Sequence, residues 1–177
     1  MRTFSHPHNY PPSITPRQVR ERFEYRDGNL WWRVRPSNRV NMNKPAGWIS
    51  SNGYRHVGIK GSSEVRMYSA HRLVWCWHAG KWPMDQIDHI DGNRLNNEIT
   101  NLREATNAEN QHNRGKKSNN TSGFMGVSWN KNDGRWWAKI TIDRRQIHIG
   151  RFDCPKEAHA AYCRAADNHH GEFARHG

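Results

Sequence analysis

The stretch IDHIDGNRLNNEITNLREATNAENQHN, residues 87–113, decides the fold of the middle of this chain. Its first residues are strand-like, DGNRLNNE is a polar loop, ITNLREA is strand-like again, and TNAENQHNR is helical. Thr106 and Glu109 have the spacing of a capping box, which predicts that the helix begins near Thr106. Residues 84–115 are therefore predicted to fold as two strands and a helix.

Three side chains of this segment are of the types that phosphodiester hydrolysis requires. Asp88 and His89 lie in the first strand, and Asn110 falls in the second turn of the helix, from which it can face that strand. Hydrolysis needs a general base for water and a hard cation on the phosphate oxygens. Imidazole can serve as the base near neutral pH, and carboxylate and amide oxygens suit Mg²⁺ or Mn²⁺. The spacing therefore indicates nuclease-like chemistry.

The composition indicates a polyanionic partner. The 177 residues include 28 Lys and Arg against 16 Asp and Glu, a formal net charge of +12, which favours binding to nucleic acid. There is no basic amphipathic helix and no run of about eighteen apolar residues, so we expect no membrane contact. The N-terminus lacks a secretion signal, and the three cysteines lack CxxC spacing. We therefore expect a cytoplasmic protein without a disulfide framework.

The hydrophobic content of 34% predicts small modules rather than one large core. Residues 1–14 are expected to be a disordered tail, and residues 15–83 an N-terminal β region that ends in a helix. Its short strands are separated by the turn dipeptides DG and NG. The helix is predicted over residues 70–80, AHRLVWCWHAG, and Gly80 is a suitable stop.

The last segment, residues 123–177, shows strict alternation in RWWAKITID, which predicts a strand with one packed and one open face. FMGVSW and QIHIGRF complete a three-stranded antiparallel sheet. Residues 116–122 form a basic linker before it. A helix is predicted from Pro155, and its small packing face comprises Ala158, Ala161, Tyr162 and Ala165.

The DH, NN, NL and EN pairs of the central segment, with HRLVW before them, resemble the HNH endonuclease family. The nearest pattern is the phage homing-endonuclease branch, in which the last His is replaced by Asn. The resemblance implies that His89 is the general base, that Asp88 and Asn110 bind one divalent cation, Mg²⁺ or Mn²⁺, and that Asn101 braces the base. His112 is the alternative last ligand, although the spacing from Asn101 favours Asn110.

Residues 122–174 resemble the APETALA-type (ethylene-response-factor) DNA-binding domain through SGFMGVSW, WWAKI, IHIGRF and the alanine-rich helix. Members of that family read DNA with Arg and Trp from the sheet face. Met125, Ser128 and Lys139 depart from the plant pattern, so no target preference is carried over. The expected DNA contacts in the sheet and linker are Trp129, Lys131, Arg135, Trp137, Lys139, Arg144, Arg145, His148, Lys116 and Lys117.

These observations predict a modular α+β protein: a small antiparallel β region, a central ββα-metal finger, and a three-stranded sheet packed on one helix. The resemblances imply a sequence-selective, metal-dependent endonuclease of the phage homing type. We expect it to nick double-stranded DNA in the bacterial host, as a monomer or weak dimer, without a small-molecule cofactor. The alternatives are a non-catalytic DNA-binding regulator with a decayed nuclease motif, and a binder of RNA or single strands.

Overall fold

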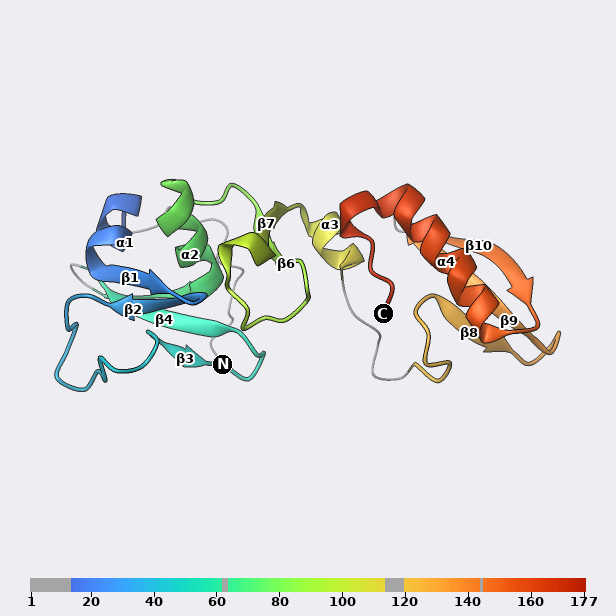
Figure 1. Cartoon of the computed structure of the whole chain (residues 1–177), viewed down its shortest axis with the longest axis horizontal. Helices are drawn as coiled ribbons and strands as arrows, with labels where there is room; N and C mark the ends of the chain where they lie inside the picture. The colour runs from blue at the N-terminus through green and yellow to red at the C-terminus, as the bar shows by residue number, and fades with distance from the viewer. Residues whose placement is uncertain (1–13, 62–63, 114–119, 144) are drawn as a thin grey trace. The chain divides into compact units, whose positions relative to one another are not determined.

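The computed structural model describes residues 14–61, 64–113, 120–143 and 145–177 (Figure 1). The chain divides into two compact units, Met1–Thr106 and Asn107–Gly177. Helices and small antiparallel sheets occur in both units, which confirms the α+β prediction. Across the described ranges, no helix is long and apolar enough to span a membrane.

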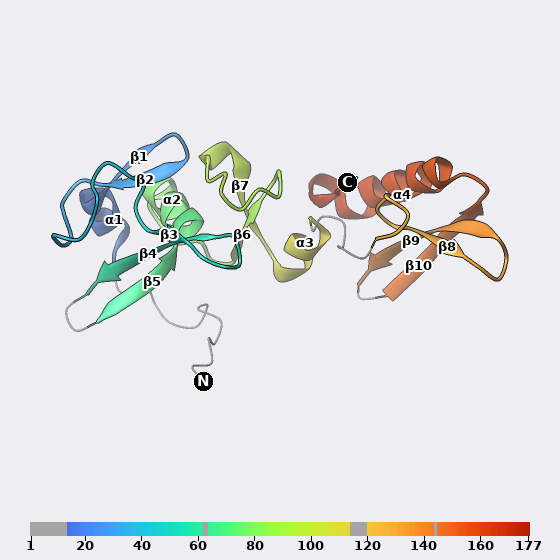
Figure 2. The ribbon, with the colours of Figure 1, turned by 90° about the horizontal axis from the view of Figure 1, so that it is seen from below.

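The described residues of the first unit form two α-helices, a 3₁₀ helix and three antiparallel sheets, with strand orders β1-β2, β3-β4-β5 and β6-β7. Helix α2 packs against α1 and against strands of the first two sheets (Figure 2). In chain order, the elements are α1 (Pro16–Arg22), β1 (Phe23–Arg26), β2 (Asn29–Trp32), β3 (Trp48–Ile49), β4 (Arg55–Lys60), β5 (Val65–Ser69), α2 (Ala70–Ala79), β6 (Gln86–His89), the 3₁₀ helix η2 (Ile99–Asn101) and β7 (Leu102–Ala105).

Local sequence signals set the ends of these elements. Thr15 caps α1 with a reciprocal capping box to Gln18, and Gly80 ends α2 in the left-handed conformation. Asp27 and Gly28 both have positive φ, as a two-residue hairpin turn between β1 and β2 requires. The predicted helix over residues 70–80 and the DG hairpin are confirmed.

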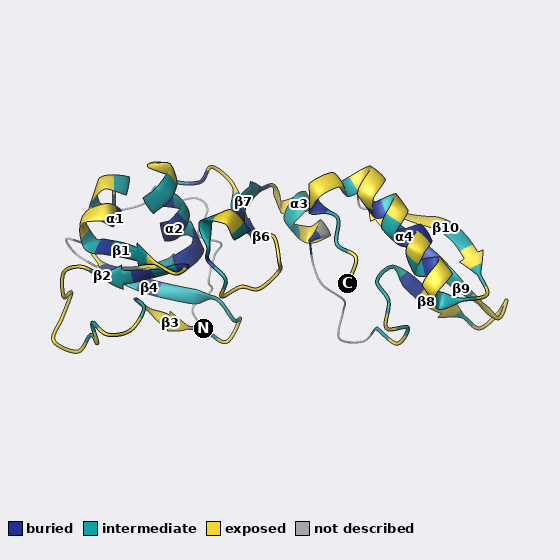
Figure 3. Ribbon diagram, viewed as in Figure 1, coloured by how far each residue is buried: buried dark blue, intermediate teal, exposed yellow. Residues whose placement is uncertain are grey.

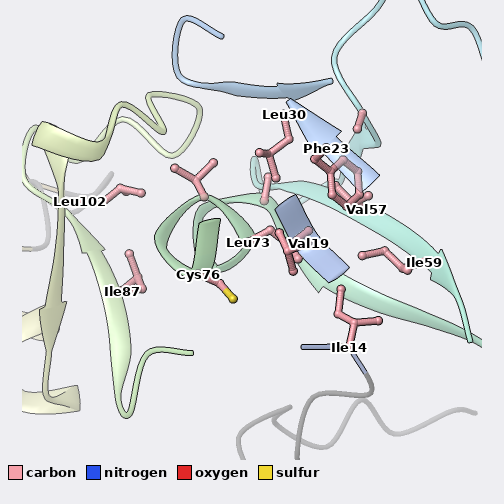
Figure 4. Packing of buried hydrophobic residues seen from close by; sticks show 13 residues of the cluster. Ile14, Val19, Phe23, Leu30, Val57, Ile59, Leu73, Cys76, Ile87 and Leu102 are labelled. Carbon is pink, nitrogen blue, oxygen red and sulfur yellow. The ribbon is translucent and has the colours of Figure 1, made fainter. Parts of the chain in front are cut away.

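One hydrophobic core joins the three sheets of the first unit through α2 (Figure 4). Val19 of α1, Phe23 of β1 and Leu73 of α2 are fully buried at its centre. Ile14, which the sequence placed in the disordered tail, is buried in this core, and its carbonyl accepts a hydrogen bond from Trp82 Nε1 at 3.0 Å. Residues 1–13 of that predicted tail lie outside the described residues.

The second unit is a three-stranded sheet of order β10-β9-β8 with α4 across one face (Figures 1 and 2). The alternation predicted for RWWAKITID is confirmed, because Ala138 and Ile140 are buried under α4. Its elements are α3 (Asn107–His112), β8 (Val127–Asn130), β9 (Arg135–Ile142), β10 (Arg145–Phe152), α4 (Pro155–His170) and the 3₁₀ helix η3 (Gly171–Phe173).

Helix α4 carries a buried stripe along the sheet (Figure 3). The stripe contains Ala158, Ala161 and Tyr162, as predicted, but Ala166 rather than Ala165 is fully buried at its end. Ala166 follows Tyr162 by four residues, about one helical turn, so it extends the stripe, and the half-buried Ala165 packs against the same cluster.

The predicted ββα module is divided between the two units. Strands β6 and β7 belong to the first unit, whereas α3 begins the second at Asn107. The helix starts one residue after Thr106, in agreement with the predicted start. The end of the module near residue 115 stays a prediction; in the structure, β7 contributes to the first core and α3 packs against η3.

Candidate active site and nucleic-acid interface

Asp88 and His89 lie at the end of β6, and each has a different neighbour on β7. Cross-strand pairs join Asp88 to Arg103 and His89 to Leu102. Successive strand residues point to opposite faces, so the carboxylate and the imidazole leave the hairpin on different sides of the end of β6. Both side chains are buried, with exposed fractions of 5% and 4%.

Arg103 forms a buried ion pair with Asp88. Its Nε and Nη2 atoms donate to Asp88 Oδ2 at 2.9 and 2.8 Å. A buried carboxylate needs such compensation, because removing an unpaired charge from water is costly. Sequence reasoning did not select Arg103; counting residues across the hairpin register would have found it.

The His89 ring lies among three side chains. His89 Nε2 is 3.0 Å from Oδ1 of Asn97, and both groups are buried. The ring of His71, from the first turn of α2, contacts it edge to face with 5.1 Å between centroids. Tyr54 contacts both imidazoles, at 5.3 Å from His71 and 6.0 Å from His89. These contacts restrain the ring in one orientation.

His71 is a neutral imidazole in this site. Its pKa is lowered to about 3, mainly by burial, and the nearby His89, Arg72 and His56 act in the same direction. The ring packs against His89 without adding a positive charge near neutral pH. The HRLVW pattern contained this residue, but the sequence offered no reason to place it beside His89.

Asn101 organises the loop that follows His89. Its Nδ2 donates to Asp91 Oδ1 at 3.0 Å and to the Asn96 carbonyl at 2.8 Å, and its Oδ1 accepts from the Asp91 amide at 3.0 Å. Burial raises the pKa of Asp91, but hydrogen bonds from Asn96, Asn93 and Asn101 outweigh it and keep the pKa below its usual value. Asn101 was predicted to brace the base. It holds the backbone after His89, while Asn97 contacts the ring.

Two tyrosines tie this loop to the N-terminal sheets. The Arg94 guanidinium lies over the Tyr54 ring at 5.0 Å and donates to the Asn52 carbonyl at 2.8 Å. The Tyr25 hydroxyl donates to Glu98 Oε2 at 2.6 Å. The site is therefore a continuation of the first core and does not rest on the hairpin alone.

The remaining predicted ligand, Asn110, lies in α3 and so in the second unit. The alternative, His112, ends the same helix, and its side chain is outside the described part of the structure. The described residues contain no group of three or more His, Cys, Asp and Glu side chains arranged so that they could hold a metal ion. Asp88 as a carboxylate ligand fits Mg²⁺ or Mn²⁺, since Mg²⁺ usually binds one or two carboxylates and completes its shell with water and substrate phosphate.

The open face of the second unit, away from α4, is centred on Trp137. Lys139 Nζ lies 4.7 Å and Arg151 Cζ 5.3 Å from the Trp137 ring, and the His148 ring contacts its edge at 4.7 Å. The Trp137 Nε1 donates to Asp133 at 2.8 Å, which fixes the indole. A shallow groove on this face is lined by Trp137, Lys139, Gln146, His148 and Arg151.

A β-bulge decides which residues of β10 reach the open face. The register shifts between His148 and Gly150, so His148 pairs with Lys139 and Arg151 pairs with Trp137. Simple alternation would place His148 and Arg151 on opposite faces, whereas the bulge puts both on the same face. Arg151 was missed by sequence reasoning for this reason.

The strand registers place two other predicted contacts on the opposite face of the sheet. Trp129 pairs with Trp136, and Arg145 pairs with Ile142, on the side where α4 packs, although both side chains are exposed. Arg135 and Lys131 are exposed, in β9 and in the turn before it, as predicted. Lys116, Lys117 and Arg144 lie outside the described residues.

Comparison with known proteins agrees with both resemblances. Residues 68–112 match the HNH endonuclease family, and residues 122–172 match the AP2 domain. The chain is also 37% identical over 107 residues to Protein 3.8 of Escherichia phage T7. That similarity covers 59% of this chain and 88% of the phage protein.

Proposed function

The chain belongs to the HNH endonuclease family and carries an AP2 domain, and we propose that it is a metal-dependent endonuclease that cleaves double-stranded DNA. The observation that carries this proposal is the buried Asp88–His89 pair at the end of β6. The ring is held in place by Asn97, His71 and Tyr54. Such a restrained, buried imidazole suits the general base in the hydrolysis of a phosphodiester.

In this proposal, His89 takes the proton of the attacking water. With Asn97 Oδ1 as acceptor, Nε2 carries the ring hydrogen, and Nδ1 has the lone pair that a general base needs. Asn101 keeps the loop after His89 fixed, so the imidazole does not need to reorganise during the reaction. The expected products are a 5′-phosphate and a 3′-hydroxyl.

Asp88 and Asn110 are the residues we propose as ligands of one Mg²⁺ or Mn²⁺. When bound, the ion would supply positive charge to the phosphate and to the leaving 3′ oxygen. Asp88 offers a hard carboxylate ligand and Asn110 an amide oxygen. His112 is the alternative to Asn110.

The second unit is proposed to bind the duplex through its open face. Trp137, Lys139, His148 and Arg151 combine planar and cationic groups on a sheet of a width that fits the major groove. Arg135 and Lys131 extend this surface at the β8–β9 end. We also propose that Lys116, Lys117 and Arg144, outside the described residues, contact the DNA backbone.

We further propose a homing-type role in a phage-infected cell, with one nick per binding event, because the chain has one nuclease motif. The test is incubation of phage and host genomic DNA with the protein in Mg²⁺ or Mn²⁺, followed by sequencing of the ends. We expect recurrent single-strand breaks with 5′-phosphates that vanish in excess chelator. Breaks that persist in chelator would contradict the metal-dependent mechanism. Tight duplex binding without breaks would instead support the DNA-binding regulator.

A further inference from the structure

We propose that Asp133 is a positioning residue for DNA binding, which holds Trp137 and Arg151 in the orientation in which they meet the duplex. Asp133 lies in the turn between β8 and β9, Trp137 in β9 and Arg151 in β10. The inference rests on the proposed function, since it takes the open face as the DNA-binding face. It gives a role in DNA binding to an acidic residue, whose own charge repels phosphate.

The first argument concerns the contacts of the Asp133 carboxylate. Its Oδ2 accepts a hydrogen bond from Trp137 Nε1 at 2.8 Å and lies 3.5 Å from Arg151 Nε. These two partners come from adjacent strands, whose register places Arg151 opposite Trp137. The Asp133 side chain is 25% exposed, so water screens its contacts less than those of a fully exposed residue. One carboxylate oxygen therefore ties the indole and the guanidinium to the same point.

The second argument concerns the cations that lie on the Trp137 ring. Arg151 Cζ is 5.3 Å and Lys139 Nζ 4.7 Å from the centre of this ring. An indole free to turn about its side-chain bonds would no longer offer both cations this surface. Fixing the side chains before the duplex arrives reduces the conformational entropy that is lost on binding. Asp133 therefore raises the affinity for DNA through preorganisation.

The third argument concerns the hydrogen on the indole nitrogen. The indole of Trp137 has one N–H donor, and Asp133 accepts its hydrogen bond. The nitrogen is thus engaged within the protein, and the ring surface of Trp137 is the part that can contact the duplex. This contact depends on where the ring lies, which the hydrogen bond to Asp133 sets.

The experiment compares the duplex affinities of Asp133→Ala and Asp153→Ala by fluorescence anisotropy at fixed salt. Each variant removes one carboxylate that pairs with an arginine of the second unit, so the net charge rises equally. Electrostatics alone predicts tighter binding in both. We expect Asp133→Ala to bind about fivefold more weakly than the wild type, the equivalent of one hydrogen bond. Asp153→Ala should bind as tightly as the wild type or more tightly.

A second comparison tests whether Asp133 acts through the indole. Trp137→Phe keeps an aromatic ring but has no N–H, so adding Asp133→Ala to it should cost little further affinity. Additive losses, or an Asp133→Ala variant that binds as tightly as Asp153→Ala, would overturn the inference. Wild-type affinity in Trp137→Ala would instead contradict the open face as the DNA-binding face, which separates the two failures.

The thermal stability of Asp133→Ala shows whether a loss of affinity reflects unfolding. It should stay close to that of the wild type, because both contacts of the carboxylate lie at the surface. If Asp133→Ala does not fold, Trp137→Phe answers the question by itself, since it removes the same hydrogen bond. It should bind about fivefold more weakly than the wild type, and wild-type affinity would overturn the inference.

Discussion

At the residue scale, the buried ring of His71 makes the stability of the first unit depend on pH. Its pKa is about 3 in the folded protein, against an ordinary value of 6.5. Between these two values the unfolded chain binds a proton that the folded chain does not bind. The free energy of unfolding should therefore fall by up to about 1.4 kcal/mol per pH unit as the pH drops below 6.5. Above pH 6.5, His71 should not make the free energy of unfolding depend on pH.

This prediction is checked by urea unfolding at pH 7.5, 6.0 and 5.0. His71→Phe should lose stability less steeply with falling pH than the wild type does, because phenylalanine takes up no proton. His148→Phe removes an exposed imidazole and serves as the control, with an unchanged slope. A wild-type slope retained in His71→Phe would show that this ring is protonated in the folded state.

Only some residues of the candidate site could be predicted from the sequence. Asp88 and His89 could be selected because hydrolysis requires their atom types. Asn97 and His71 could not, since their relation to the site depends on packing rather than on spacing, whereas Arg103 could have been found from the register of the hairpin. The sequence does not distinguish the several Asn residues of this loop, and only the folded structure shows which one contacts the His89 ring.

At the element scale, the two faces of the C-terminal sheet should respond differently to the loss of an indole. Trp137→Ala removes the ring that organises Lys139 and Arg151, and we expect duplex affinity to fall by about tenfold, the size of one good contact. Trp129→Ala removes the same kind of side chain from the opposite face and is the matched control. Fluorescence anisotropy at fixed salt measures both. Equal losses would mean that the open face is not the DNA-binding face.

The packing of α4 on this sheet depends on Gly126. This residue has φ of +68°, and a Cβ there would collide with the Tyr162 ring. Gly126→Ala should therefore lower the free energy of unfolding by about 1–3 kcal/mol beyond the conformational cost. Gly134→Ala at φ of +63° is the control, because it has the same conformational cost and no neighbour within 4 Å. Equal thermal stabilities of the two variants would contradict this packing.

The strands and helices followed from local signals, whereas their irregularities did not. Alternation in β9 and the capping box at Thr15 act within a few residues, so the chain itself reveals them. The bulge after His148 lies where Ile149 packs against the core under α4, and Gly150 within QIHIGRF allows a bulge without fixing its position. That single irregularity brought Arg151 to the open face.

At the scale of the whole molecule, the excess of 12 positive charges should dominate duplex affinity. The logarithm of the binding constant should fall with the logarithm of salt concentration, with a slope of about −0.9 per phosphate contact. Replacing both Lys139 and Arg151 by Gln should reduce the steepness by about two contacts. Binding measured from 50 to 300 mM salt tests this expectation. An unchanged slope would mean that Lys139 and Arg151 on the open face do not contact phosphates.

The division into a nuclease unit and an AP2-type unit was predictable, because each carries a specific motif. The sequence did not predict where the boundary between the two compact units lies. The capping signal at Thr106 shows where α3 begins, and the packing of α3 against η3 places the helix in the second unit.

The central claim is that His89 performs the chemistry while other residues bind the DNA. The most direct measurement compares cleavage and duplex affinity of the wild type, His89→Ala and the exposed-site control His176→Ala in Mg²⁺. We predict that His89→Ala loses cleavage by at least about a thousandfold, with duplex affinity within about twofold of the wild type, because the base and the binding surface are separate. Cleavage retained in His89→Ala, with the control also active, would contradict the account.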